Sequence, residues 1–134
     1  MQDKLRFEKS ELNNNRPMLI NRRGAIRPAI KLTENIAENE DFGYSFNIIR
    51  AVDNGSTCVG LMNNKTEMTG LIFINPAGDL LIYGNQSRYE NTGMNLKTGK
   101  MYKITVRCTR ETESIEVEVK GLGKYTSRIK FAPY

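Results

Sequence analysis

The chain has 134 residues, of which 39% are hydrophobic and 26% charged, and a formal net charge of +5, with no histidine and no tryptophan. This is the size and composition of one globular domain with a single core. Without histidine, neither a Ser-His-Asp triad nor a histidine-based zinc site can form, and we expect no resident metal or cofactor.

No apolar run approaches the roughly 20 residues that a membrane-spanning helix requires. The N-terminal sequence is charged and lacks the apolar core of a signal peptide. These features leave the compartment open: cytoplasmic, or secreted or cell-surface if a leader has been removed.

The first third of the chain predicts short strands separated by polar loops. Residues 4–8 and 25–32 alternate apolar and polar side chains, which is typical of strands, and Pro28 makes the second an edge or broken strand. Residues 13–17 predict a turn and residues 33–41 a loop.

The middle of the chain predicts four strands. Residues 42–52 and 57–62 are the first two, with an Asn-Gly turn between them and another turn at residues 63–66. Residues 71–74 and 80–83 are apolar on both faces, so we expect them in the centre of a sheet or as the floor of a groove. A turn at residues 75–79 joins these two strands, and a polar loop follows them.

The last third predicts a second hairpin. Residues 100–109 and 115–119 alternate with strand periodicity, which directs seven side chains inward: Tyr102, Ile104, Val106, Cys108, Ile115, Val117 and Val119. On the other face, Glu116 and Glu118 are expected opposite Lys103 and Arg107. A glycine turn at residues 121–123 precedes a final strand over residues 125–131.

Eight or nine short strands at intervals of about ten residues are the pattern of a β-sandwich. We therefore predict an all-β fold, a two-sheet antiparallel sandwich of jelly-roll type, as a single domain over residues 1–134.

Residues 42–121 resemble the concanavalin A-like lectin and laminin G-like jelly-roll superfamily. The resemblance is carried by FGYSFNIIRAV, CVGLM, GLIFINPAGDLLIYG and NLKTGKMYKITVRCTRETESIEVEVKG. It implies two antiparallel sheets, one of them concave, in a module that binds sugars or protein partners. Some members bind sialylated sugars as accessory domains of sialidases, and others are glycoside hydrolases.

A candidate ligand face lies around the end of the strand at residues 80–83. Tyrosine rings can stack on a sugar, asparagine can bond its hydroxyls, and arginine suits a carboxylate. The candidate binding residues are Arg50, Tyr83, Asn85, Arg88 and Tyr89. An ordinary exposed loop is the competing interpretation.

Other motifs have simpler explanations. Glu116 and Glu118 have the spacing of retaining-glycosidase acids, but flanking bases favour a solvated ion-paired face, so we expect no enzyme. Oxygen-bearing turn residues could bind calcium, but turn formation is favoured: Asp53, Asn54, Asn75 and Asp79. Cys58 and Cys108 are expected to be small buried residues that could pair only if their strands face each other.

The sequence thus predicts a non-catalytic carbohydrate-binding module, with sialylated or other acidic glycans as candidate ligands. A protein-interaction or assembly module on the same sandwich is the alternative. Nucleic-acid binding ranks lower, because few aromatic side chains accompany the basic cluster formed by Arg16, Arg22, Arg23, Arg27 and Lys31. The sugar and the oligomeric state stay open.

Overall fold

The structure is a computed structural model, and it describes residues 5–10, 16–21, 40–50, 55–62, 68–84 and 88–128. The chain forms two compact units, residues 1–35 and 36–134. The smaller unit contains a hairpin of β1 (Leu5–Ser10) and β2 (Arg16–Asn21), paired antiparallel. That one domain spans residues 1–134 stays a prediction.

β1 confirms the strand predicted near residues 4–8, but β2 was not predicted. Arg16 and Pro17 were assigned to a turn, and the structure places both in β2. Pro17 is paired with Lys9 in a two-stranded sheet, where each strand has a free edge that tolerates a missing N–H. The predicted strand at residues 25–32 lies outside the described residues.

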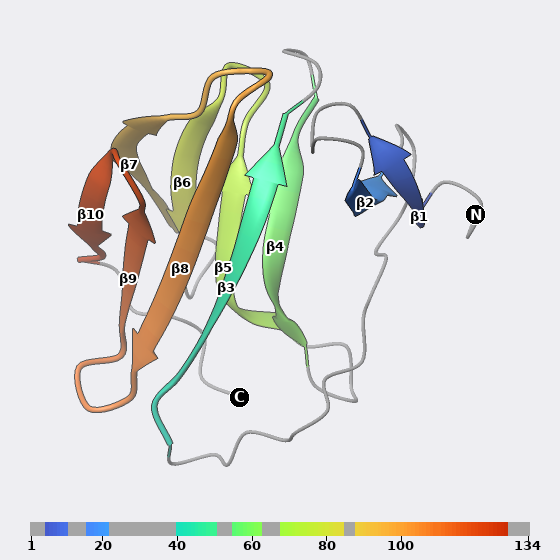
Figure 1. Cartoon of the computed structure of the whole chain (residues 1–134). Coiled ribbons are helices and arrows are strands. Elements are labelled where there is room, and N and C mark those ends of the chain that lie inside the picture. The colour runs from blue at the N-terminus through green and yellow to red at the C-terminus, as the bar shows by residue number, and fades with distance from the viewer. Residues whose placement is uncertain are drawn as a thin grey trace. The chain divides into compact units, whose positions relative to one another are not determined.

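The larger unit consists of two four-stranded antiparallel sheets (Figure 1). The first, which we call the β8 sheet, has the order β10-β9-β8-β3. Its strands are β3 (Phe42–Ile49), β8 (Met101–Thr109), β9 (Ser114–Val119) and β10 (Gly123–Thr126). The second, the β6 sheet, is the meander β4 (Thr57–Met62), β5 (Met68–Ile74), β6 (Asp79–Tyr83) and β7 (Tyr89–Asn95).

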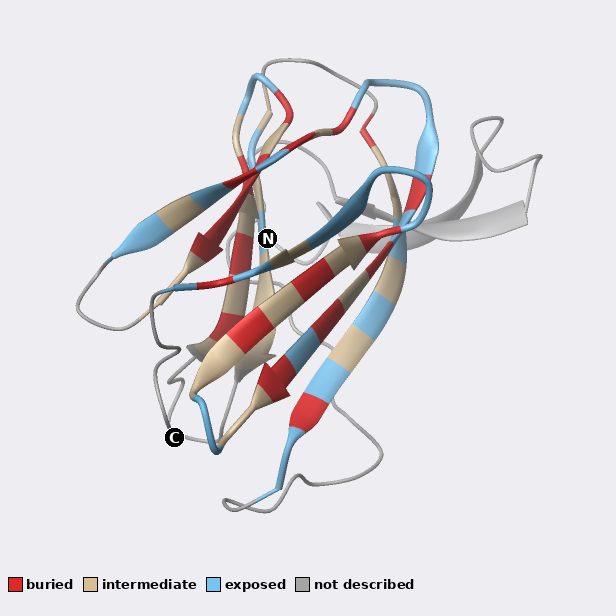
Figure 2. Cartoon of the chain, turned by 90° about the vertical axis from the view of Figure 1, so that its left-hand side faces the viewer, coloured by how far each residue is buried: buried red, intermediate tan, exposed pale blue. Residues whose placement is uncertain are grey.

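The core lies between the inward faces of these two sheets. Alternate residues of β8 and β9 are buried, which Figure 2 shows as bands along neighbouring strands. The buried cluster takes in the inward residues predicted for the second hairpin and adds Phe42, Ile72, Ile74, Leu80, Ile82, Met94 and Leu96. The predicted all-β sandwich is therefore confirmed, as is the central position of β5 and β6.

β7 is the main error of the sequence analysis, which placed a polar loop after Tyr83. The strand reads YENTGMN, and only Thr92 and Met94 within it are buried. β7 is an edge strand, and its pairing with β6 shifts register between Asp79 and Leu81. An edge strand that buries few side chains has no sustained apolar alternation, which is the signal that sequence reasoning uses.

The two cysteines differ in environment, and both are free. Cys108 is buried as predicted, but Cys58 is exposed, so the prediction was wrong for this residue. Cys58 pairs with Phe73 on the outward face of the edge strand β4, and this explains its exposure. Within the described part of the chain, no helix is long and apolar enough to cross a bilayer.

Candidate functional site

Three aromatic side chains form a row across the β6 sheet, one each from β5, β6 and β7. The ring centroids of Phe73 and Tyr83 are 5.8 Å apart, and those of Tyr83 and Tyr89 are 5.7 Å apart. Tyr83 and Tyr89 are opposite each other in the strand register. Two tyrosines of the predicted site are thus brought together, and Phe73 extends the row.

This aromatic row lies on the outward face of the sheet. In β5 and β6 the side chains of Ile72, Ile74, Leu80 and Ile82 belong to the core, and strand alternation places their neighbours on the opposite face. Leu81, also outward, keeps only 8% of its surface exposed. The outward face of the β6 sheet therefore carries apolar side chains, of which Leu81 is buried and Phe73 and Tyr83 are partly exposed.

The β7 end of the row is the exposed one. Phe73 and Tyr83 are half-buried, whereas Tyr89 is 61% exposed and is the most exposed large hydrophobic side chain among the described residues. An exposed ring with an apolar face and a polar hydroxyl is suited to contacts with sugars and with proteins.

The β6–β7 connection is closed beside this row. The Gly84 N–H donates to the Arg88 carbonyl at 2.8 Å, and Tyr83 and Tyr89 are the next pair of the ladder. Arg88 is exposed, and its position at the base of the loop lies next to Tyr89 in the chain. Asn85 lies outside the described residues, so its predicted role stays a prediction.

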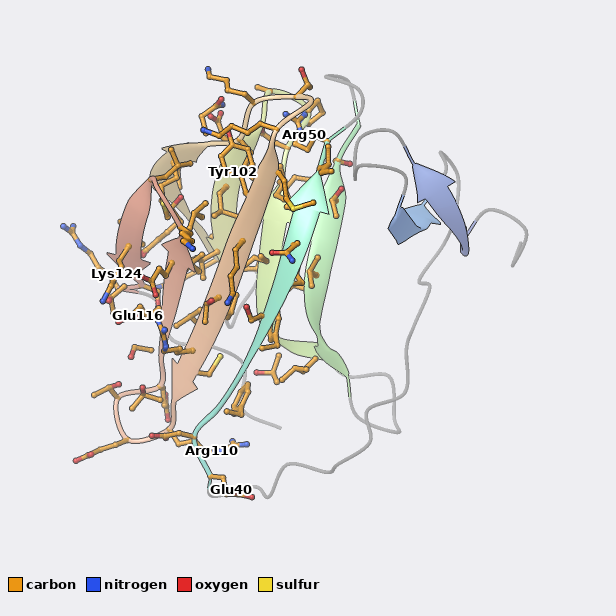
Figure 3. All side chains as sticks on the ribbon, viewed as in Figure 1. Glu40, Arg50, Tyr102, Arg110, Glu116 and Lys124 are labelled. Carbon is orange, nitrogen blue, oxygen red and sulfur yellow. The ribbon has the colours of Figure 1, made fainter. Side chains whose placement is uncertain are left out.

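Arg50 occupies a different part of the sandwich. Its guanidinium donates to the Leu96 carbonyl at 2.8 Å and to the Pro76 carbonyl at 2.9 Å, and the residue is 8% exposed. Pro76 belongs to the β5–β6 turn, at the opposite end of β6 from Tyr83. Arg50 and Tyr102 mark this end of the sandwich in Figure 3. The structure therefore does not bring Arg50 to the tyrosines, and its guanidinium nitrogens are bonded to backbone.

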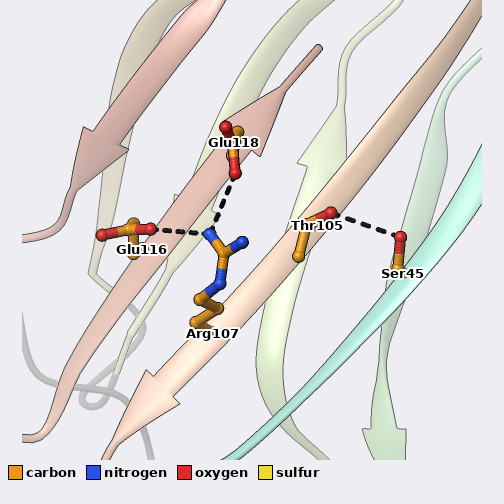
Figure 4. Close-up of polar contacts among 5 residues, drawn as sticks. All are labelled: Ser45, Thr105, Arg107, Glu116 and Glu118. Carbon is orange, nitrogen blue, oxygen red and sulfur yellow. Dashed lines mark hydrogen bonds and ion pairs between the residues drawn. The ribbon is translucent and has the colours of Figure 1, made fainter.

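The outward face of the β8 sheet is polar and bears the two candidate acids. Arg107 Nη1 lies 2.8 Å from Glu116 Oε1 and 3.0 Å from Glu118 Oε1 (Figure 4). Ser45 and Thr105 share a hydrogen bond on the same face. Arg107 thus binds both predicted acids. Lys103 does not lie opposite either of them: it lies opposite Lys120, whose N–H donates to the Lys103 carbonyl at 3.0 Å.

Two of the turn residues that were considered as calcium ligands, Asn75 and Asp79, form hydrogen bonds with each other. The Asp79 carboxylate accepts from the Asn95 amide at 2.9 Å, and the Asn75 side chain accepts the Asp79 N–H at 2.9 Å. Hydrogen bonds from Asn95 and Asn75 lower the pKa of Asp79. Among the described side chains no group of three or more acidic or thiol residues is clustered as metal ligands would be. Asp53 and Asn54 lie outside the described residues.

Sequence reasoning missed two residues of the outward face. Phe73 was counted among the apolar strand residues, and only its position opposite Leu81 shows that it faces outward. Asn91 lies opposite Leu81 on β7, the strand that was not predicted. The predicted basic cluster adds nothing here, since its side chains lie outside the described residues.

No protein-family model and no curated protein matches the chain. Among solved structures, the chain is similar to one titled "Sialidase", with a TM-score of 0.59 and 22% sequence identity. The match covers 70% of this chain, which spans only 8% of the length of that protein. At this identity the likeness is one of fold, and it agrees with the two-sheet sandwich.

Proposed function

We propose that this chain is a non-catalytic, carbohydrate-binding, lectin-like module whose sugar site lies on the outward face of the β6 sheet. The observation that carries the proposal is the exposed ring of Tyr89 beside Tyr83 on an apolar sheet face. Sugars present C–H faces that pack on aromatic rings, while their hydroxyls need nearby polar side chains. Tyr89 supplies the first kind of contact, and Arg88, exposed at the base of the β6–β7 loop, is the proposed source of the second.

Acidic glycans, including sialylated ones, are the proposed ligand class. A guanidinium pairs with a carboxylate more strongly than a neutral donor does, and Arg88 is exposed at the strand end that precedes Tyr89 in the chain. The similarity to part of a structure titled "Sialidase" agrees with a lectin-like or laminin G-like module of the kind that accompanies sugar-processing domains.

The absence of catalysis is part of the proposal. Glu116 and Glu118 both bond to the single guanidinium of Arg107. Both side chains are therefore engaged in an ion pair with one base, whereas glycoside hydrolysis requires a general acid and a second carboxylate that both face the sugar. The candidate acids also lie on the β8 sheet, whereas the aromatic row lies on the outward face of the β6 sheet.

A glycan array tests the proposal. The wild-type protein would be compared with Tyr89→Ala, Tyr83→Ala and Arg88→Ala, at protein concentrations that detect millimolar affinities. Lys103→Ala, an exposed position on the β8 sheet, is the matched surface control. We expect hits that weaken in the tyrosine variants, hits on acidic glycans that weaken in Arg88→Ala, and no change in the control. An array without hits would contradict the proposal.

A protein-interaction module is the second candidate, favoured by the outward aliphatic side chains beside the row. Leu71 alternates with core residues, is half-buried and is absent from the core cluster, and it lies on the same face as the half-buried Phe73. An apolar face of this kind also suits a protein partner. Light scattering after gel filtration distinguishes this function from carbohydrate binding. A dimer that dissociates in the Phe73→Ser variant would favour protein association.

A further inference from the structure

The geometry of the aromatic row limits how many rings a sugar can use. The planes of Phe73 and Tyr83 meet at 84°, and those of Tyr83 and Tyr89 at 37°. Sugar rings that follow one another in an extended chain need several aromatic faces in one plane. The three rings here are not coplanar, so they do not form a flat platform.

Burial reduces the available surface further. Tyr83 has Phe73 on one side and Tyr89 on the other and is half-buried, whereas Tyr89 is 61% exposed. A stacked ligand needs an accessible face, and Tyr89 offers the largest one. Tyr83 then acts as a positioning residue, because its ring contacts Tyr89 and restricts the rotamers that Tyr89 can adopt.

Asn91 is the polar residue that accompanies Tyr89 on this face. The two residues are two positions apart in β7 and both are exposed, so their Cα atoms are about 6–7 Å apart on one side of the strand. Asn91 Oδ1 accepts the Gly93 N–H at 2.8 Å. This bond orients the amide and uses one lone pair of the oxygen, and the Nδ2 hydrogens remain as donors for a ligand.

We infer that the site holds a single sugar ring, stacked on Tyr89 and hydrogen-bonded through a hydroxyl or carboxylate oxygen to Asn91 Nδ2. The ligand class is therefore a terminal sugar residue or a monosaccharide unit, not an extended polysaccharide chain. This inference rests on the proposed function and specifies its site.

Chain length is the first test. Binding of methyl glycosides of glucose, galactose, mannose, N-acetylglucosamine and N-acetylneuraminic acid would be measured by chemical-shift titration of the ¹⁵N-labelled full chain. Oligosaccharides that end in the same sugars would follow. We expect unchanged affinity as the oligosaccharide lengthens. A second stacked ring would raise affinity by about tenfold or more, and such a rise would overturn the single-ring site while leaving sugar binding intact.

Asn91→Asp is the second test. Aspartate keeps an oxygen for the Gly93 N–H but has no Nδ2 donor, so the fold should persist while affinity for a neutral glycoside falls at least about fivefold. Asn91→Ser makes a related test without a new charge: its hydroxyl can also accept the N–H two residues on, but the side chain is too short to place a donor where Nδ2 lies. Asn47→Asp, exposed on the β8 sheet, is the matched control.

The outcomes separate the two proposals. Unchanged affinity in both Asn91 variants would reject Asn91 as a ligand residue. Binding lost in both, with Asn47→Asp unaffected, would support the inferred site. If no glycoside or oligosaccharide binds, the proposed carbohydrate function fails and this inference falls with it.

Discussion

The Glu90 carboxylate binds the backbone of Arg128 and so joins the two sheets at one edge of the sandwich. Glu90 Oε1 and Oε2 accept the Arg128 N–H at 2.7 and 2.9 Å, and the Tyr125 hydroxyl lies 3.3 Å from Oε1. Glu90 is in β7, whereas Tyr125 is in β10 of the other sheet. Desolvation, followed by the Glu90 charge, raises the pKa of Tyr125.

Glu90→Gln should weaken this link. The amide keeps one acceptor oxygen but loses the negative charge that strengthens the bonds, so we expect about 1 kcal/mol lower stability in urea unfolding. Glu111→Gln, exposed in the β8–β9 turn, should be neutral and is the matched control. Equal effects of the two substitutions would show that the charge of Glu90 adds no stability to the link.

Arg50→Met should destabilise the fold without reporting on the sugar site. Methionine fills a similar volume but leaves the carbonyls of Leu96 and Pro76 without their donor, an expected loss of about 3 kcal/mol. Gly78 packs against this arginine so closely that a Cβ there would lie 2.6 Å from Nη1. The measurement is thermal or urea unfolding, with exposed Arg88→Met as the control; a neutral Arg50→Met would contradict the anchoring role.

The sequence predicted those parts of the fold in which burial imposes a period. β3, β8 and β9 have one face in the core, so their apolar residues recur at every second position and both their existence and orientation were predicted correctly. Arg107 could also be predicted to meet Glu116, because the short turn fixes the register of that hairpin.

The candidate site was only partly predictable, because it depends on which strands are neighbours. Tyr83 and Tyr89 were chosen for their chemistry and do lie together, but Phe73 joins them only through the β5–β6 register. Arg50 was misplaced, since an arginine at a strand end has the same local sequence whether it faces a ligand or caps a turn. Asn91 was missed with the edge strand that carries it.

The two cysteines should differ in reactivity toward a thiol reagent. Burial raises the pKa of the Cys108 thiol to about 12, so almost no thiolate exists at neutral pH, and the side chain is enclosed in the core. Cys58 is exposed, although partial desolvation also raises the pKa of its thiol. We expect one slow alkylation in the native protein, at Cys58, and a second only in denaturant.

Cys58→Ser and Cys108→Ser identify the sites in that experiment. Native labelling should vanish in Cys58→Ser and persist in Cys108→Ser. If Cys108 reacts in the folded protein as fast as Cys58 does, the prediction that the core encloses the Cys108 side chain is wrong.

Acid should selectively weaken the turn that contains Asp79. Hydrogen bonds from Asn95 and Asn75, assisted by the charge of Lys97, lower the pKa of this carboxyl in the folded state. A lowered folded pKa means that its stabilisation is fully present above the unfolded value of about 3.9 and is lost as the pH falls through the folded value. The melting temperatures of wild type and Asp79→Asn, which cannot titrate here, should therefore converge between about pH 4 and pH 2. The control is Glu111→Gln, at an exposed position remote in sequence, which provides the baseline for other carboxylates. A difference in melting temperature between wild type and Asp79→Asn that stays constant over this pH range would show that Asp79 is not stabilised in its ionised form.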